Sequence, residues 1–229
     1  MAINGSEKLN KFIIGFRDEM PILIGVFPFG MLYAILARGI GLSSIEVQAM
    51  SLFVFAGSSQ LMLIQLAELK SPILMMIMTG FIINLRHILY SASISPYTKK
   101  LSSIWKYSLS YLLTDEAYAV AISNYSKNKN DYNHWYFLGA GIALWSTWQL
   151  STLIGFLVGS RIPENWSLNF TLPLTFIALL VPMVKDRPGI IAALVAGFLA
   201  LVTIGAPYNL GLIVASLIGI IAGLWSEKP

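Results

Sequence analysis

The sequence predicts an all-α, polytopic integral membrane protein with about seven to eight transmembrane helices, at least one of them broken or kinked. Hydrophobic residues make up 56% of the 229 residues, above the roughly 45–50% of a soluble domain. Charged residues make up only 11%, too few to cover a water-facing surface. The apolar segments follow one another closely from Pro21 to Trp225, so we expect residues 1–229 to form a single transmembrane domain.

The stretch before the first apolar segment is amphipathic. Apolar residues recur at helical spacing from Leu9 to Met20, with Lys8, Lys11 and Arg17 around them. Such a pattern is typical of a helix that lies in the membrane interface. We therefore predict an interfacial helix over 8–20, with a disordered tail as the alternative.

Eight apolar segments can be recognised in the sequence. They are about Pro21–Ala37, Ile45–Ala67, Ile73–Ile94, Ile104–Ser123, Trp135–Gly159, Leu172–Val184, Ile190–Gly205 and Leu210–Trp225. About 20 residues span a bilayer. Because the sixth and seventh segments are short, seven full spans or a re-entrant piece is the alternative to eight spans.

The basic residues between the segments predict the orientation. With the N-terminus inside, nine basic residues fall in one set of loops: Lys8, Lys11, Arg17, Lys70, Lys127, Lys129, Lys185, Arg187 and Lys228. Five fall in the other set: Arg38, Lys99, Lys100, Lys106 and Arg161. Cytoplasmic loops carry the excess of Lys and Arg. We expect both termini on the cytoplasmic side of the cell membrane, although the Lys99-Lys100 pair argues against it.

Two segments contain residues that disturb a helix. In the second segment, Gly57, Ser58, Ser59 and Gln60 interrupt the apolar run at mid-membrane. This stretch predicts a broken helix whose freed backbone groups line a cavity; the alternative is close helix packing through small residues.

The first segment carries Pro28 and Phe29 within Gly-Val-Phe-Pro-Phe-Gly. A proline inside a helix removes one backbone hydrogen bond and bends the helix. The sequence predicts a kink here, either beside a ligand or as a purely structural bend.

The third and fourth segments contain ionisable residues. Asn84, Arg86 and His87 lie in the third, and Asp115 and Glu116 lie in the fourth. A charge in the hydrocarbon costs about 2.5–3.5 kcal/mol on insertion scales, so such residues face a bundle interior or a wet cavity. Arg86 is the only basic residue well inside a span, which makes it the expected partner of one carboxylate. The alternatives are Arg86 reaching lipid phosphates, a purely structural ion pair, and a structural role for His87.

Adjacent residues on a helix point about 100° apart. One of Asp115 and Glu116 could therefore face a cavity while the other pairs with a basic group. A buried carboxylate without a partner can take up a proton, which would permit proton coupling.

The composition excludes several other classes of site. The chain has no cysteine and only two histidines, so we expect no disulfide, metal site or other cofactor. No phosphate-binding loop of the GxxxxGK[ST] type is present, which argues against an ATP-driven pump. No pattern joins Asp115 and Glu116 to a nucleophile or a metal ligand, so an enzyme is not expected.

Five stretches, together and in this order, resemble one known family: Pro28-Phe-Gly, Ala37-Arg-Gly-Ile-Gly-Leu-Ser, Val54-Phe-Ala-Gly-Ser-Ser-Gln60, Asn84-Leu-Arg-His-Ile-Leu-Tyr90 and Leu113-Thr-Asp-Glu-Ala-Tyr118. The family is AzlC, the larger subunit of azaleucine-resistance permeases. The resemblance covers about residues 21–118. It implies export of branched-chain amino acids by a secondary, ion- or proton-coupled transporter, together with a small hydrophobic AzlD-type subunit.

The resemblance and the residues together suggest how a zwitterion would bind. Backbone N–H groups of Gly57 to Gln60 would hold the carboxylate, and Asp115 would face the ammonium group. Phe29, Phe55 and Met62 could form part of an apolar wall. Two alternatives remain: a passive channel for a small polar solute, and a non-transporting assembly subunit whose partner carries the site.

Overall fold

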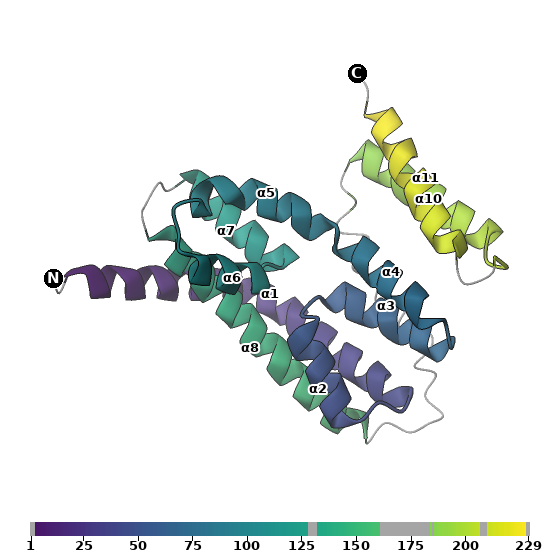
Figure 1. Ribbon diagram of the computed structural model, residues 1–229, viewed down its shortest axis with the longest axis horizontal. Coiled ribbons are helices and arrows are strands. Elements are labelled where there is room, and N and C mark those ends of the chain that lie inside the picture. Colours follow the sequence, from purple (N-terminus) through teal and green to yellow (C-terminus); the bar gives the residue numbers. More distant parts are fainter. Residues whose placement is uncertain (1–2, 128–131, 161–183, 185, 207–209, 228–229) are drawn as a thin grey trace. The chain divides into compact units, whose positions relative to one another are not determined.

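Every regular element in the described residues is a helix. The computed structural model describes residues 3–127, 132–160, 184, 186–206 and 210–227. The helices are α1 (Ile3–Gly39), α2 (Ser44–Phe53), α3 (Gly57–Glu68), α4 (Ile73–Asn84), α5 (Arg86–Thr98), α6 (Ser103–Tyr111), α7 (Asp115–Lys127), α8 (Asn133–Gly159), α10 (Arg187–Val202) and α11 (Leu210–Ser226) (Figure 1). The all-α prediction is therefore confirmed for these residues.

The chain divides into two compact units. The first comprises Met1–Lys70 and Met76–Ile162, and the second comprises Ser71–Met75 and Pro163–Pro229. Within the described residues, three helical stretches are long and apolar enough to cross a membrane. They are Gly5–Gly39 in α1, Ile73–Thr98, which comprises α4 and α5, and Asn133–Gly159, which is α8. The count of seven or eight spans stays a prediction. The sixth apolar segment, Leu172–Val184, lies outside the described residues except for Val184.

Helices α1 and α8 form the core of the first unit. Glycines let their backbones touch: Gly15 lies against the Tyr136 carbonyl, and Gly155 lies against the backbone of Met31. The N-terminal part of one helix thus meets the N-terminal part of the other, so the two run in the same direction. The first and fifth segments of a chain that crosses the membrane alternately must also run in the same direction, which agrees with this pairing.

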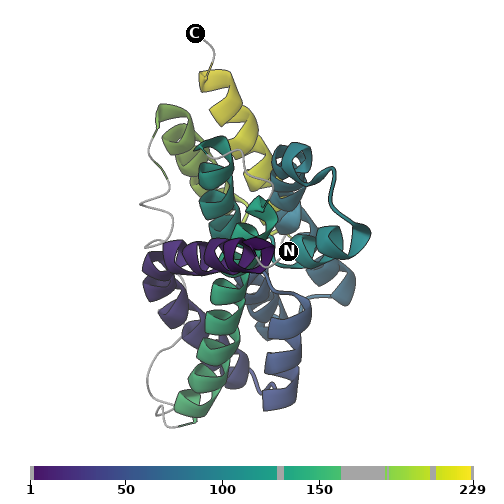
Figure 2. The same cartoon turned by 90° about the vertical axis from the view of Figure 1, so that its left-hand side faces the viewer.

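Helix α1 contains both the stretch predicted as an interfacial helix and the first apolar segment. It continues without interruption from Ile3 to Gly39, with Pro21 and Pro28 inside it. Residues 8–20 are helical as predicted, but they continue directly into the first apolar segment; their position in the membrane interface stays a prediction. The two parts of the ribbon differ in direction but are continuous (Figures 1 and 2). A proline inside a helix removes one backbone hydrogen bond and crowds the carbonyl four residues earlier, which bends the helix without having to end it.

Three of the predicted segments are interrupted helices. The second is broken between Phe53 and Gly57, where Ala56 has an extended backbone (φ −149°, ψ 90°). This break, at the start of the small polar stretch, confirms the prediction. The third changes at Leu85, where hydrogen bonds to the third residue back replace those to the fourth.

The fourth segment is broken between Tyr111 and Asp115, and this break was not predicted. Thr114 begins the new helix, because its Oγ1 accepts a hydrogen bond from the Ala117 N–H at 3.3 Å. No glycine or proline marks the break in the sequence.

The second unit contains the helix pair α10 and α11. Asp186 caps α10 by accepting a hydrogen bond from the Gly189 N–H at 2.9 Å. The two helices run antiparallel, since Gly211 lies against Thr203 whereas Gly223 lies against Pro188.

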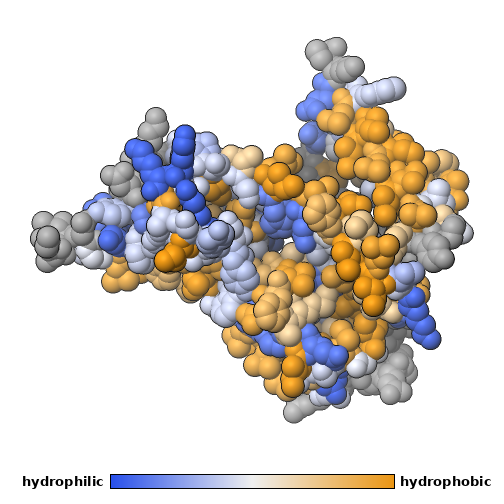
Figure 3. Space-filling model, in the orientation of Figure 1, coloured by the Kyte–Doolittle hydropathy of each residue, from blue (hydrophilic) through white to orange (hydrophobic). Residues whose placement is uncertain are grey.

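Their outer surfaces are strongly apolar (Figure 3). Exposed residues include Leu194, Phe198, Leu201, Leu217 and Leu224. Large exposed apolar patches are typical of surfaces that face lipid or another protein.

Candidate functional site

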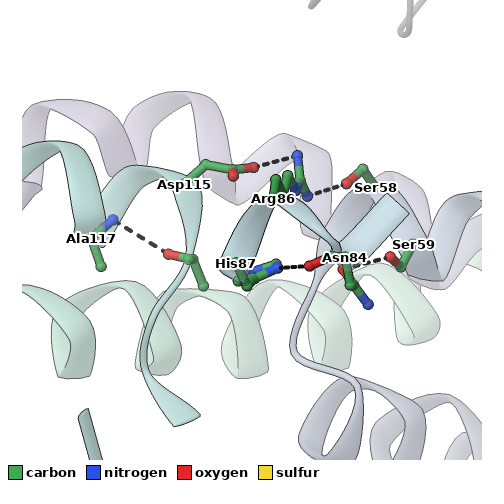
Figure 4. Close-up of polar contacts among 8 residues, drawn as sticks. Ser58, Ser59, Asn84, Arg86, His87, Asp115 and Ala117 are labelled. Carbon is green, nitrogen blue, oxygen red and sulfur yellow. Dashed lines mark hydrogen bonds and ion pairs between the residues drawn. The ribbon is translucent and has the colours of Figure 1, made fainter. Parts of the chain in front are cut away.

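The three interruptions of the first unit meet at one group of polar side chains. We name as the polar cluster Ser58, Ser59, Asn84, Arg86, His87 and Asp115 (Figure 4). The first two residues come from the beginning of α3, the next three from the junction of α4 and α5, and the last from the beginning of α7. Each interruption therefore contributes its terminal residues, so the breaks and the cluster form one structural feature.

An ion pair lies at the centre of the polar cluster. Arg86 Nη1 is 2.6 Å from Asp115 Oδ2, and Arg86 Nη2 donates to Ser58 Oγ at 2.5 Å. The pairing predicted from the scarcity of basic residues is confirmed. Both side chains are partly accessible, at 29% for Arg86 and 33% for Asp115. Within the described residues, Arg86 Nε and Asp115 Oδ1 are buried without a hydrogen-bond partner. Each residue of the ion pair therefore has one polar atom that could still form a hydrogen bond.

A second row of contacts runs beside the ion pair (Figure 4). Ser59 Oγ donates to Asn84 Oδ1 at 2.9 Å. His87 Nδ1 lies 3.1 Å from the Asn84 carbonyl oxygen, a hydrogen bond in which the ring nitrogen donates. These bonds join the beginning of α3 to the junction of α4 and α5, and they give His87 a structural contact.

The beginning of α3 adds backbone donors to this region. The first backbone hydrogen bond of the helix runs from the Gln60 N–H to the Ala56 carbonyl, and no side chain caps this end. The N–H groups of Gly57, Ser58 and Ser59 therefore lie ahead of the helical bonding pattern. Such groups, with the helix dipole, favour an anion.

Trp148 of α8 borders the same helix end. Its Nε1 donates to Gln60 Oε1 at 3.1 Å, and its ring lies 5.8 Å from Phe29 in an edge-to-face arrangement. A Cβ on Gly57 would lie 2.6 Å from Trp148 Cη2 and 3.1 Å from Phe29 Cε1. Glycine is needed here because the aromatic rings approach the backbone closely. Trp148 was missed in the sequence, since α8 is far from α3 along the chain.

The other predicted residues lie elsewhere. Pro28 is exposed on α1 and is not part of the polar cluster, so its contact with a ligand stays a prediction. Phe55 is buried, with its ring 5.9 Å from Tyr111. Met62 is half-buried on α3.

Glu116 lies beside Asp115 in the sequence, but its charge acts on Glu19 of α1. Glu19 was not predicted as part of the site.

Comparison with known proteins identifies the family. The family described as AzlC protein matches residues 21–162, a range that contains the whole polar cluster. The chain belongs to the AzlC family.

Two curated relatives cover almost the full length of this AzlC chain. It is 26% identical to the inner membrane protein YgaZ of Escherichia coli (strain K12), over 95% of this chain and 93% of that protein. It is 31% identical to an uncharacterized membrane protein of Archaeoglobus fulgidus, over 93% of this chain and 94% of that protein. No solved structure matches the chain. These relatives, together with the apolar helices, identify a membrane protein.

Proposed function

We propose that this AzlC protein is a permease that exports branched-chain or similar small apolar amino acids by secondary, proton-coupled transport. It works in the cell membrane with a small hydrophobic AzlD-type partner subunit. Membership of the AzlC family and the membrane proteins among its relatives support a role in membrane transport.

The Arg86–Asp115 pair is the observation that carries the proposal. It lies where three interrupted helices meet, and each partner keeps a polar atom without a hydrogen-bond partner among the described residues. Interrupted helices at membrane depth are tolerated where their free backbone groups line a cavity or a site. A structural ion pair alone would not require α3 to begin there with its N–H groups uncapped.

An amino acid carries charges that complement this arrangement. In the proposed complex, the substrate ammonium group binds Asp115, and the carboxylate binds Arg86 together with the N–H groups at the start of α3. Phe29 and Trp148, which lie beside Gly57, form an apolar wall for the side chain. Substrate thus replaces part of the contact between Arg86 and Asp115, so that neither charge is left unpaired.

Transport of labelled leucine tests the proposal. The chain and its partner are reconstituted into vesicles, with and without a pH gradient. We expect leucine to accumulate against its gradient only when both chains and the pH gradient are present. Equilibration without accumulation would indicate a passive channel, and coupled transport by the chain alone would refute the need for the partner. Leucine binding by the partner alone would indicate that this chain is an assembly subunit.

The orientation of the chain provides a separate prediction. The nine-to-five distribution of basic residues in the sequence favours cytoplasmic N- and C-termini. Reporter tags fused to the two ends should therefore both report the cytoplasmic side. Tags that report opposite sides would contradict an even number of spans.

A further inference from the structure

Glu19 is the most unusual ionisable residue in the described part of the chain. It lies in the middle of α1 and none of its surface is exposed (0%). Both carboxylate oxygens are buried without a hydrogen-bond partner among the described residues. An ionised carboxylate in such a place loses its hydration without compensation, which is far more costly than burying a neutral acid.

A second carboxyl group makes the ionised form of Glu19 still less favourable. Helix α1 packs against α7, and Glu116 in the first turn of α7 is close enough to repel Glu19 electrostatically. Two carboxylates that share a site of low polarity cannot both stay ionised, so such a pair holds a proton. No basic side chain forms a salt bridge with either residue in the described part of the chain.

We propose that Glu19, which is buried, and Glu116, which is half-buried, form a carboxyl pair that binds and releases the proton of the transport cycle. The inference rests on the proposed proton-coupled function and assigns the coupling site to residues outside the polar cluster. The step is a simple proton transfer: a carboxylate of the pair accepts a proton from water on loading and returns it on release.

The groups around the pair provide part of a connection to the surface. On the side of α8, the Tyr136 hydroxyl interacts with Glu19 and donates a hydrogen bond to Asp18 Oδ2 at 2.6 Å. Asp18 is exposed on α1, and Asn124 of α7 also contacts Tyr136. The hydroxyl thus bonds the exposed Asp18 and is electrostatically influenced by the buried Glu19 without a hydrogen bond to it, so a proton path from Asp18 to Glu19 would need a further bridging group.

The first turn of α7 connects the proton pair to the substrate site. Asp115 forms the ion pair with Arg86, whereas the neighbouring Glu116 acts electrostatically on Glu19. Asp115 and Arg86 act electrostatically on Glu116, and the Thr114 side chain forms a hydrogen bond with it. A change of charge on Glu116 therefore alters the field at Asp115, one residue away, and this provides a physical means of coupling proton loading to substrate binding.

Infrared difference spectroscopy of the purified protein, reconstituted with its partner, tests the pair without transport. We expect a band from a protonated carboxyl group that disappears as the pH is raised. It should be missing from Glu19→Gln and from Glu19→Met, an apolar replacement that provides a second folded variant. Glu68→Gln, which changes an exposed carboxyl at the end of α3, should keep the band. A band that persists in both Glu19 variants would overturn the proposal.

Glu116→Gln tests whether the two carboxyls share the proton. It should change the pH at which the band disappears, and an unchanged titration would refute the pairing. In vesicles, Glu19→Gln should abolish stimulation by the pH gradient while exchange of labelled for unlabelled leucine continues. Stimulation that persists at the wild-type level would show that the pair does not carry the coupled proton.

The same measurements separate failure of this inference from failure of the proposed function. If the wild-type protein shows the band but moves no leucine, the permease proposal fails and the proton site stands. If it transports leucine with a proton while the Glu19 variants keep the band, the permease proposal stands and this inference fails. Replacing protons by sodium ions in the gradient should not restore accumulation; restoration would identify a metal cation as the coupling ion.

Discussion

Asp115→Asn should reduce leucine transport by at least about tenfold while the protein still reaches the membrane. The substitution keeps the shape of the side chain but removes the charge that binds Arg86 and, in the proposed complex, the ammonium group. Charge-assisted hydrogen bonds contribute about 1.5–3 kcal/mol, which sets the size of the expected loss. Initial rates of labelled leucine transport in vesicles, normalised to reconstituted protein, provide the measurement.

The stability of the same variant separates two roles of Asp115. Removing the carboxylate leaves Arg86 unpaired, which should lower the free energy of unfolding by about 1–3 kcal/mol. The lower part of this range is expected because the two side chains remain 29% and 33% accessible. The double variant Arg86→Gln/Asp115→Asn should regain thermal stability, since no unpaired charge remains, but should not regain transport.

Three results would contradict this view of the ion pair. A stable Asp115→Asn protein with normal, pH-dependent transport would reject both the binding role and the structural role. Normal transport by the double variant would show that the pair is dispensable. A double variant no more stable than Asp115→Asn would show that the unpaired charge is not what destabilises the single variant.

The sequence alone predicted two features of the site, the helix break before Gly57 and the ion pair of Arg86, because each depends on the type of residue at its own position. The break before Gly57 could be predicted because small and polar residues interrupt an apolar run. A contact between Arg86 and either Asp115 or Glu116 followed from electrostatics alone, since no other basic residue lies well inside a predicted span; the choice of Asp115 was left open. Both predictions needed only the cost of placing polar groups in hydrocarbon.

Features that depend on contacts between distant helices could not be predicted in this way. Glu19 follows Arg17 and Asp18 and resembles the polar side of an interfacial helix; only the packing of α1 against α7 and α8 buries it. Trp148 lies in an apolar run that gives no sign of its bond to Gln60. The break before Asp115 carries no helix-breaking residue, and Thr114 acts as a cap only because the chain has already turned.

Gly139→Ala should be among the most destabilising small substitutions in the first unit. A Cβ at this position would lie 2.9 Å from the carbonyl carbon of Phe12 and 3.0 Å from the N atom of Phe16, and closer still to the Phe12 carbonyl oxygen. All three atoms belong to the α1 backbone, which cannot move aside by a change of rotamer. Overpacking of this kind costs about 1–3 kcal/mol, and we expect the upper part of that range.

Gly25→Ala is the matched control, because a Cβ there meets no atom within 4 Å. The same chemical change in an open part of α1 should leave stability unchanged or raise it by up to about 1 kcal/mol, since alanine favours the helix more than glycine does. Thermal unfolding of both variants in one detergent, followed by size-exclusion chromatography, gives the comparison. Equal unfolding temperatures would refute the direct backbone contact between α1 and α8. A clear loss in Gly139→Ala alone would support the close packing of α8 on α1 at Phe12 and Phe16.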